Sequence, residues 1–201
     1  MTCVKSFFVT GTALLLAGCI GPVGQTLSDF APADAEGEID KTMRSYSQRA
    51  ITSVGDGFAW KVGTYGNGNL MGVAGLTAGT DVAPPPPSGT ANYTGQFNIG
   101  LVEDIHVTST AIYGYTGDDT GAFSVTADFD SNRITGSGAG RDGILRIDGE
   151  ISGDRFAGSS SYRGVSGKSK GLAGSDMAIG VVHGNSDDLI YAGGFRANRR
   201  Y

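Results

Sequence analysis

The residues from Ser88 to Tyr201 contain no proline, and in short runs they alternate between apolar and polar side chains. Proline cannot donate a hydrogen bond to a β-ladder, so its absence favours strands throughout this segment. Alternation with period two places one set of side chains on each face of a sheet. The runs predict eight strands: Thr90–Leu101, Ile105–Tyr113, Ala122–Phe129, Arg133–Gly138, Ile144–Ile151, Arg155–Arg163, Met177–His183 and Leu189–Arg196.

Eight antiparallel strands with one apolar face suffice to close a barrel whose interior is filled by side chains. The predicted inward face includes five phenylalanines, which argues against an empty lumen. A β-sandwich is the competing layout. A transmembrane barrel is disfavoured, because the outward face carries charges such as Arg146, Asp148 and Glu150 where lipid would require apolar side chains. The predicted fold class is therefore all-β: an eight-stranded antiparallel soluble β-barrel preceded by a flexible tether and a short strand-rich lead-in.

The N-terminus has the pattern of a secretory leader. Lys5 precedes the apolar stretch Phe7–Leu16, which is too short to span a bilayer as a helix. The tetrad Leu16-Ala17-Gly18-Cys19 resembles the bacterial lipobox, in which cleavage falls before the cysteine and that cysteine is acylated, for example with palmitate. We therefore expect residues 1–18 to be a lipoprotein signal peptide and Cys19 to anchor the chain in the membrane. The alternative is an ordinary secretory peptide with a chance cysteine.

Between the leader and the barrel, composition divides the chain into two further segments. Residues 19–53 predict a flexible tether with a candidate short helix at Glu38–Ile51, where Ile39, Met43 and Tyr46 have helical spacing. Residues 54–87 predict a strand-rich lead-in that ends in the polyproline spacer Pro84–Pro87. Residues 88–201 form the expected barrel domain. Because residue 20 is Ile and not Asp, the outer membrane is the favoured destination.

Charge and residue chemistry exclude several classes of function. The formal net charge of −5 argues against nucleic acid as a partner. With two Cys and two His in the whole chain, a Cys/His zinc site is out of reach. No nucleophile–base–acid pattern has a recognisable signature, and the expected antiparallel barrel offers no strand-to-helix elbow to host one. We therefore expect no enzyme and no cofactor.

The barrel segment resembles the C-terminal barrel domain of transferrin-binding protein B and related surface lipoproteins. The resemblance covers about 110 of the 201 residues. It implies an eight-stranded barrel preceded by a small strand-rich handle, for which Val54–Val82 is the candidate, and a non-enzymatic receptor for host or nutrient proteins. The motifs that carry it, in order, are Gly89-Thr-Ala-Asn-Tyr-Thr-Gly95, Ala127-Asp-Phe-Asp130, Ile134-Thr-Gly136, Leu145-Arg-Ile-Asp-Gly149, Ile151-Ser-Gly153, Phe156-Ala-Gly158 and Tyr191-Ala-Gly-Gly-Phe195.

Loops at a barrel end can vary without disturbing the wall, so ligand contacts are sought there. The candidate loops are Val102–Asp104, Tyr115–Thr120, Gly164–Ser175 and Gly184–Asp188. The candidate ligand-binding residues are Lys168, Lys170, His183, Asp187 and Asp188. Asp118-Asp119 are interpreted as solvated side chains in a turn. His106 is interpreted as a solvated side chain on the polar face of a strand.

The sequence thus predicts an outer-membrane lipoprotein, displayed at the cell surface, that binds a protein or nutrient ligand, with iron or haem as candidate nutrients. Its partners are the membrane, through Cys19, and that unidentified ligand. The alternative is a structural or assembly lipoprotein that faces the periplasm. A carrier of small molecules in the barrel mouth is a third hypothesis, which the inward phenylalanines oppose.

Overall fold

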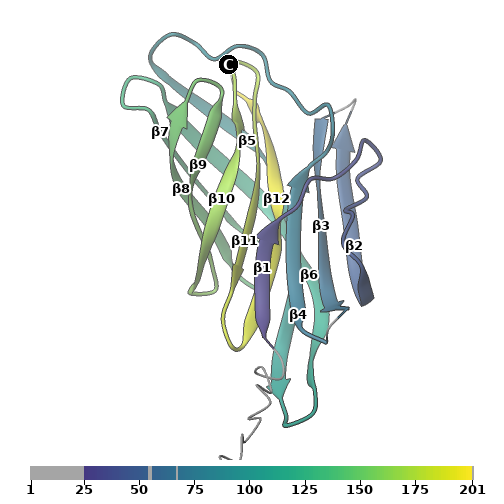
Figure 1. Ribbon diagram of the computed structural model, residues 1–201. Coiled ribbons are helices and arrows are strands. Elements are labelled where there is room, and N and C mark those ends of the chain that lie inside the picture. The colour runs from purple at the N-terminus through teal and green to yellow at the C-terminus, as the bar shows by residue number, and fades with distance from the viewer. Residues whose placement is uncertain (1–24, 54–55, 67, 201) are drawn as a thin grey trace, which may run out of the picture.

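The computed structural model describes residues 25–53, 56–66 and 68–200. All regular elements of this part are β-strands, arranged in two sheets (Figure 1). Within it, no helix is long and apolar enough to cross a membrane. The strands are β1 (Thr26–Phe30), β2 (Met43–Ser53), β3 (Asp56–Tyr65), β4 (Leu70–Leu76), β5 (Thr90–Val107), β6 (Ile112–Asp128), β7 (Arg133–Ala139), β8 (Ile144–Ser152), β9 (Arg155–Tyr162), β10 (Val165–Ala173), β11 (Met177–Asn185) and β12 (Leu189–Arg199).

Strands β5 to β12 form a closed barrel in which each strand pairs with its neighbours in the sequence, and β12 pairs with β5 to complete the ring. All eight pairings are antiparallel. The predicted all-β class and the closed eight-stranded antiparallel barrel are therefore confirmed, and the sandwich layout is not adopted. Closure removes the exposed sheet edges that an open sheet of this size would have to protect.

Aromatic rings fill the barrel interior. Phe123 lies with its ring centroid 4.7 Å from that of Phe195 and 6.0 Å from that of Phe97. The Phe156 ring stacks 6.1 Å from Phe195. These side chains belong to one buried cluster that includes residues from all eight strands of the barrel wall. The prediction of a filled lumen is thus confirmed, and ligand contacts are to be sought on the outside of the molecule.

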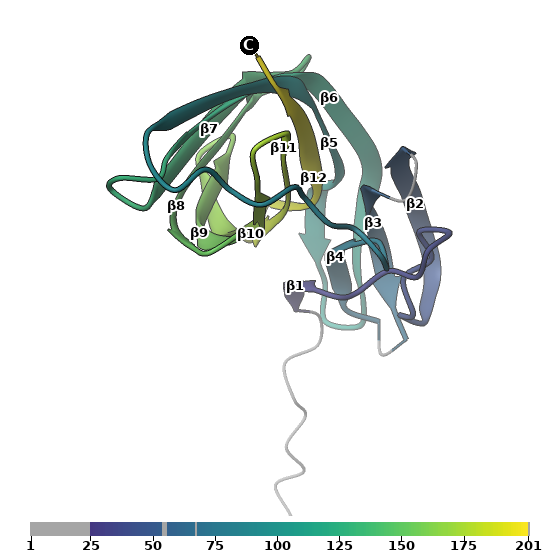
Figure 2. The ribbon, with the colours of Figure 1, turned by 90° about the horizontal axis from the view of Figure 1, so that it is seen from above.

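The second sheet has the order β1-β4-β3-β2 and lies against the outer wall of the barrel (Figures 1 and 2). We call it the handle sheet. Its side chains Phe58, Trp60 and Val62 are buried in a cluster with wall residues such as Ile179 and Ile190. Trp60 also donates a hydrogen bond from Nε1 to Asn98 Oδ1, at 2.5 Å. The predicted strand-rich lead-in is therefore part of a four-stranded sheet that shares a core with the barrel.

Two expectations for the region before the barrel are corrected. The candidate helix Glu38–Ile51 is wrong, because Met43–Ser53 form strand β2 and pair with β3. Part of the expected tether is strand β1, which pairs in parallel with β4. The helical spacing of Ile39 and Met43 reflected a real apolar pair, since both lie in one buried cluster on the far face of the handle sheet. Pairing with β3 outweighs the weak local helical preference.

The strand count of eight is right, although one predicted strand contains a turn and strand β10 was predicted as a loop. The predicted strand Ile105–Tyr113 contains the turn of the β5–β6 hairpin, and the predicted loops Val102–Asp104 and Tyr115–Thr120 lie within those two strands. The predicted loop Gly164–Ser175 is mostly strand β10. It follows β9 through a two-residue turn in which Arg163 (φ 50°) and Gly164 (φ 82°) are both left-handed.

Candidate functional site

The candidate residues occupy three places in the molecule. Lys168 and Lys170 point outward from the wall strand β10, and not from a loop as predicted. His183 lies on the neighbouring strand β11, where Lys168 is its register partner. Asp187 and Asp188 are exposed in the turn between β11 and β12, which matches the predicted Gly184–Asp188 loop in part. Cys19 lies outside the described residues.

His183 belongs to the seam where β1 of the handle sheet crosses the wall. Its Nδ1 lies 2.8 Å from Ser28 Oγ, and its ring meets the Phe30 ring edge-on with centroids 4.3 Å apart. The Ser28 hydroxyl donates to Asn185 Oδ1 at 2.8 Å, so its oxygen accepts from His183. The imidazole is 7% exposed, which places it against β1 and not in solvent.

Burial lowers the pKa of His183 to about 4, the effect of Lys168 and Lys170 adds to this lowering, and the Asp29 carboxylate opposes it. The ring is therefore neutral at physiological pH. The positive charge on this side of the barrel thus comes from Lys168 and Lys170 without a contribution from His183. Lys170 also packs against β1, with Nζ 4.4 Å from the centroid of the Phe30 ring.

A groove of about 620 Å³ opens where this seam meets the wall strands β8, β9 and β10. We call it the interface groove. The apolar part of its lining includes Pro32, Leu76 and Leu172, and the exposed charged residues in the lining are Arg155, Lys170 and Glu150. Strand β4 supplies Gly75 and Leu76, the residues after β1 supply Ala31 and Pro32, and the other lining residues are Ile151, Ser152, Phe156, Ala157 and Gly171. A partly apolar lining with two cations and one anion suits a segment that carries both apolar and acidic groups.

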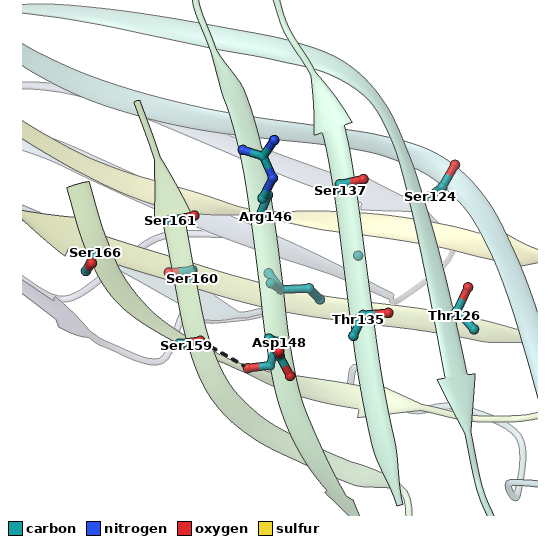
Figure 3. A pocket seen from close by; sticks show the side chains of 12 residues that line it. Ser124, Thr126, Thr135, Ser137, Arg146, Asp148, Ser159, Ser160, Ser161 and Ser166 are labelled. Carbon is teal, nitrogen blue, oxygen red and sulfur yellow. Dashed lines mark hydrogen bonds between the residues drawn. The ribbon is translucent and has the colours of Figure 1, made fainter. Parts of the chain in front are cut away.

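A second hollow, of about 580 Å³, lies on the outer wall formed by β6 to β10 (Figure 3). Most of its lining side chains are small hydroxyls, and strand register aligns Ser124, Ser137, Arg146, Ser161 and Ser166 in one row across the five strands. The lining includes no aromatic side chain on which a sugar ring would stack. Short side chains here leave a shallow polar surface that water can cover, so the interface groove is the stronger candidate.

The paired aspartates Asp118 and Asp119 do not form a solvated turn as predicted, because both lie within strand β6. Asp118 faces outward and forms an ion pair with Arg49 of the handle sheet, at 3.4 Å. Asp119 faces the barrel interior, is 2% exposed and accepts a hydrogen bond from the Tyr162 hydroxyl at 2.7 Å. Burial, and then the neighbouring Asp119 carboxylate, raise the pKa of Tyr162, which keeps the phenol protonated as the donor. In the described part of the chain, no three His, Cys, Asp or Glu side chains gather to form a candidate metal site.

Sequence reasoning missed Arg155 and the interface groove itself. The groove exists because one side of the barrel wall is covered by the handle sheet. The sequence contained a sign that the handle sheet covers these strands, because Met177–Gly184 and Leu189–Phe195 show no apolar–polar alternation. In the structure, both segments are buried on both faces. A run of this kind is typical of a strand that is covered on both sides.

No protein-family model matches the chain, and no curated protein matches it. Among solved structures, one described as a surface lipoprotein has 12% identity and a TM-score of 0.48, over 79% of this chain and 82% of that chain. The haemoglobin-bound structure of HpuA from Kingella denitrificans has 16% identity and a TM-score of 0.47, over 79% of this chain and 59% of that one. Transferrin binding protein B from serogroup B Neisseria meningitidis has 12% identity and a TM-score of 0.47, over 77% of this chain and 35% of that one. This chain therefore spans less than two thirds of the length of the last two proteins, and the similarity is one of fold.

Proposed function

We propose that this protein is a lipid-anchored binding protein of the outer membrane, displayed at the cell surface, and that its ligand is a protein. The Leu16–Cys19 motif supports the anchor. The filled barrel supports binding on the outer surface, because the interior has no room left by the packed phenylalanine rings. Protein ligands, unlike small molecules, can use a wide and partly apolar outer surface of this kind.

The interface groove is the observation that carries the proposal. Pro32, Leu76 and Leu172 contribute apolar surface, and the exposed side chains of Arg155 and Lys170 outnumber the one exposed anion of the lining, Glu150. Lys168 extends the positive charge along β10, two residues before Lys170 on the same outward face. We therefore propose that Lys168, Lys170 and Arg155 contact acidic side chains of the ligand. Asp187 and Asp188 lie near the start of β1, away from the groove lining, and His183 is covered by β1.

Reversing the charges of Lys168 and Lys170 should weaken this recognition. We expect a fluorescent peptide of alternating glutamate and leucine to bind the wild-type protein at least about tenfold more tightly than K168E/K170E, because the variant places like charges at the rim. The measurement is fluorescence anisotropy at low and moderate salt.

The matched control is R44E/R146E, which makes the same change in net charge at exposed positions outside the groove. We expect this variant to weaken peptide binding only slightly, through long-range repulsion that salt screens. Equal losses in the two double variants would mean that net charge, and not the groove, governs the interaction, and the proposed ligand contacts would then be rejected.

Surface display is tested by treating intact cells with a protease and detecting the barrel by immunoblot. We expect the barrel to be digested while a periplasmic control protein survives. Protection of the barrel until the outer membrane is permeabilised would contradict display and would favour the alternative, an assembly lipoprotein that faces the periplasm. A blot of permeabilised cells shows whether the folded barrel can be cleaved at all.

A further inference from the structure

The β5–β6 hairpin extends beyond the rest of the barrel. Pairing of β12 with β5 ends at Glu103, and pairing of β7 with β6 begins at Ser124. Apart from the pairing of its own two arms, the segment from Asp104 to Gly114 therefore has no barrel strand beside it, and it is the lowest of the hairpins in Figure 1. A register shift between Glu103 and His106, with Asp104 at a φ of 49°, bends β5 where the overhang starts.

The overhang, together with the adjoining position Tyr115, carries three large exposed side chains with apolar surface. Val107 is 60% exposed, Tyr113 is 51% exposed and Tyr115 is 68% exposed. No charged residue occurs between Asp104 and Asp118 in the sequence. A tyrosine combines an apolar ring with a polar hydroxyl, which is the chemistry enriched where a bilayer meets water.

The overhang lies at the end of the molecule where the anchored segment enters. Gln25 and Thr26 line a common hollow with Val107 and Ile112, so the start of β1 adjoins the hairpin. Cys19 lies six residues before Gln25 in the sequence. Six residues span at most about 21 Å when fully extended. A lipid on Cys19 would therefore hold the bilayer surface within that distance of the start of β1 and beside the hairpin.

We infer that the β5–β6 hairpin rests on the bilayer surface, with Val107, Tyr113 and Tyr115 in the headgroup region. The inference rests on the lipid anchor of the proposed function. Asp104, Asp187 and Asp188 at the same end would be repelled by anionic headgroups, so the fitting surface is zwitterionic. Tethering raises the effective concentration of the hairpin at the membrane, so even weakly partitioning side chains are held there.

This contact fixes the orientation of the barrel. The β8–β9 turn and the interface groove that includes Ser152 and Arg155 lie toward the opposite end from the hairpin. With the hairpin on the membrane, the groove faces away from the bilayer and stays open to a ligand. The membrane contact would thus present the binding surface that the proposed function requires.

The test uses the full-length protein, expressed with its leader, purified in detergent and reconstituted into phosphatidylcholine vesicles with or without brominated acyl chains. Tyr113→Trp replaces one aromatic side chain with another and adds a fluorescent reporter, and Tyr115→Trp is a second reporter on the same strand. Ser131→Trp, in the exposed β6–β7 turn at the other end of the barrel, is the matched control. Trp60 is the only native tryptophan and is 2% exposed, so it gives a constant background.

We expect brominated lipid to quench the emission added by Tyr113→Trp roughly twofold, because interfacial indole lies close to the brominated chains, and to leave Ser131→Trp unchanged. Intact-mass measurement of the same samples reports whether Cys19 carries acyl chains. An acylated protein in which neither hairpin tryptophan is quenched would overturn the membrane contact alone. A protein without acyl chains on Cys19 would overturn the anchor of the proposed function and this inference with it.

Discussion

Replacing Trp60 with alanine is expected to lower the free energy of unfolding by about 3–5 kcal/mol, the usual cost of truncating a buried aromatic side chain. The Trp60 ring packs between the handle sheet and the barrel wall, and its Nε1 is the donor to Asn98 Oδ1. A side chain at Gly100 would overlap this ring, so the wall is shaped to receive it. The substitution leaves a cavity and removes the hydrogen bond of a buried amide.

Chemical denaturation followed by circular dichroism measures this loss. Tyr115→Ala is the control, since its ring is 68% exposed and its removal should change stability by only about 0.5 kcal/mol. A loss below about 1 kcal/mol for Trp60→Ala would show that the handle sheet contributes little to the stability of the barrel.

Replacing Asp119 with alanine is expected to lower the free energy of unfolding by about 3 kcal/mol or more, because it removes a buried acceptor that serves several donors. The carboxylate accepts from the Tyr162 hydroxyl at 2.7 Å and from the backbone N–H groups of Arg141 at 2.8 Å and Asp142 at 3.3 Å. It thereby ties the β7–β8 turn to the barrel interior. Without it, these donors lose their partner inside the structure.

Asp118→Ala is the matched control at the adjacent position. The Asp118 carboxylate is 49% exposed and pairs with Arg49, and exposed ion pairs contribute about 0–1 kcal/mol. Hydrogen exchange at the Arg141 and Asp142 amides gives a second measurement, which should quicken in Asp119→Ala and stay unchanged in Asp118→Ala. Equal effects of the two substitutions would contradict the buried role of Asp119.

Local patterning was sufficient for the barrel where one face of a strand is apolar and the other polar. Strand β8 has this alternation, and its bounds Ile144–Ser152 differ from the predicted Ile144–Ile151 by one residue. Strand β10 has no visible alternation, because its inward positions include Gly167, Ser169 and Gly171. A side chain at Gly171 would overlap the Phe156 ring, so the crowded interior demands small residues there. Because the inward residues of β10 are small, the sequence shows no apolar–polar alternation there. The strand was therefore not predicted, and Lys168 and Lys170 were assigned to a loop.

The candidate site was harder to predict than the barrel strands, because it is formed by contacts between distant parts of the chain. Lys168 and Lys170 were found because they lie in Gly164–Ser175, the longest of the predicted loops. Arg155 was not found, because its neighbours in the groove include Pro32 and Leu76 of the handle sheet, far from it in the sequence. Nothing local in Thr26–Phe30 indicates that β1 will pair with β4 and cover His183.

The sequence by itself determined the all-β class and the filled interior, since these follow from period-two patterning and from the size of the inward side chains. The predicted count of eight barrel strands is right, although it includes Ile105–Tyr113, which contains a hairpin turn, and omits β10. Only the tertiary structure decided that residues before the barrel form a sheet, that this sheet buries one side of the wall, and that a groove opens beside it. The physical reason is the distance along the chain between the residues that interact. Alternation is a property of neighbouring residues, whereas the groove is formed by surfaces that meet only after the chain has closed on itself.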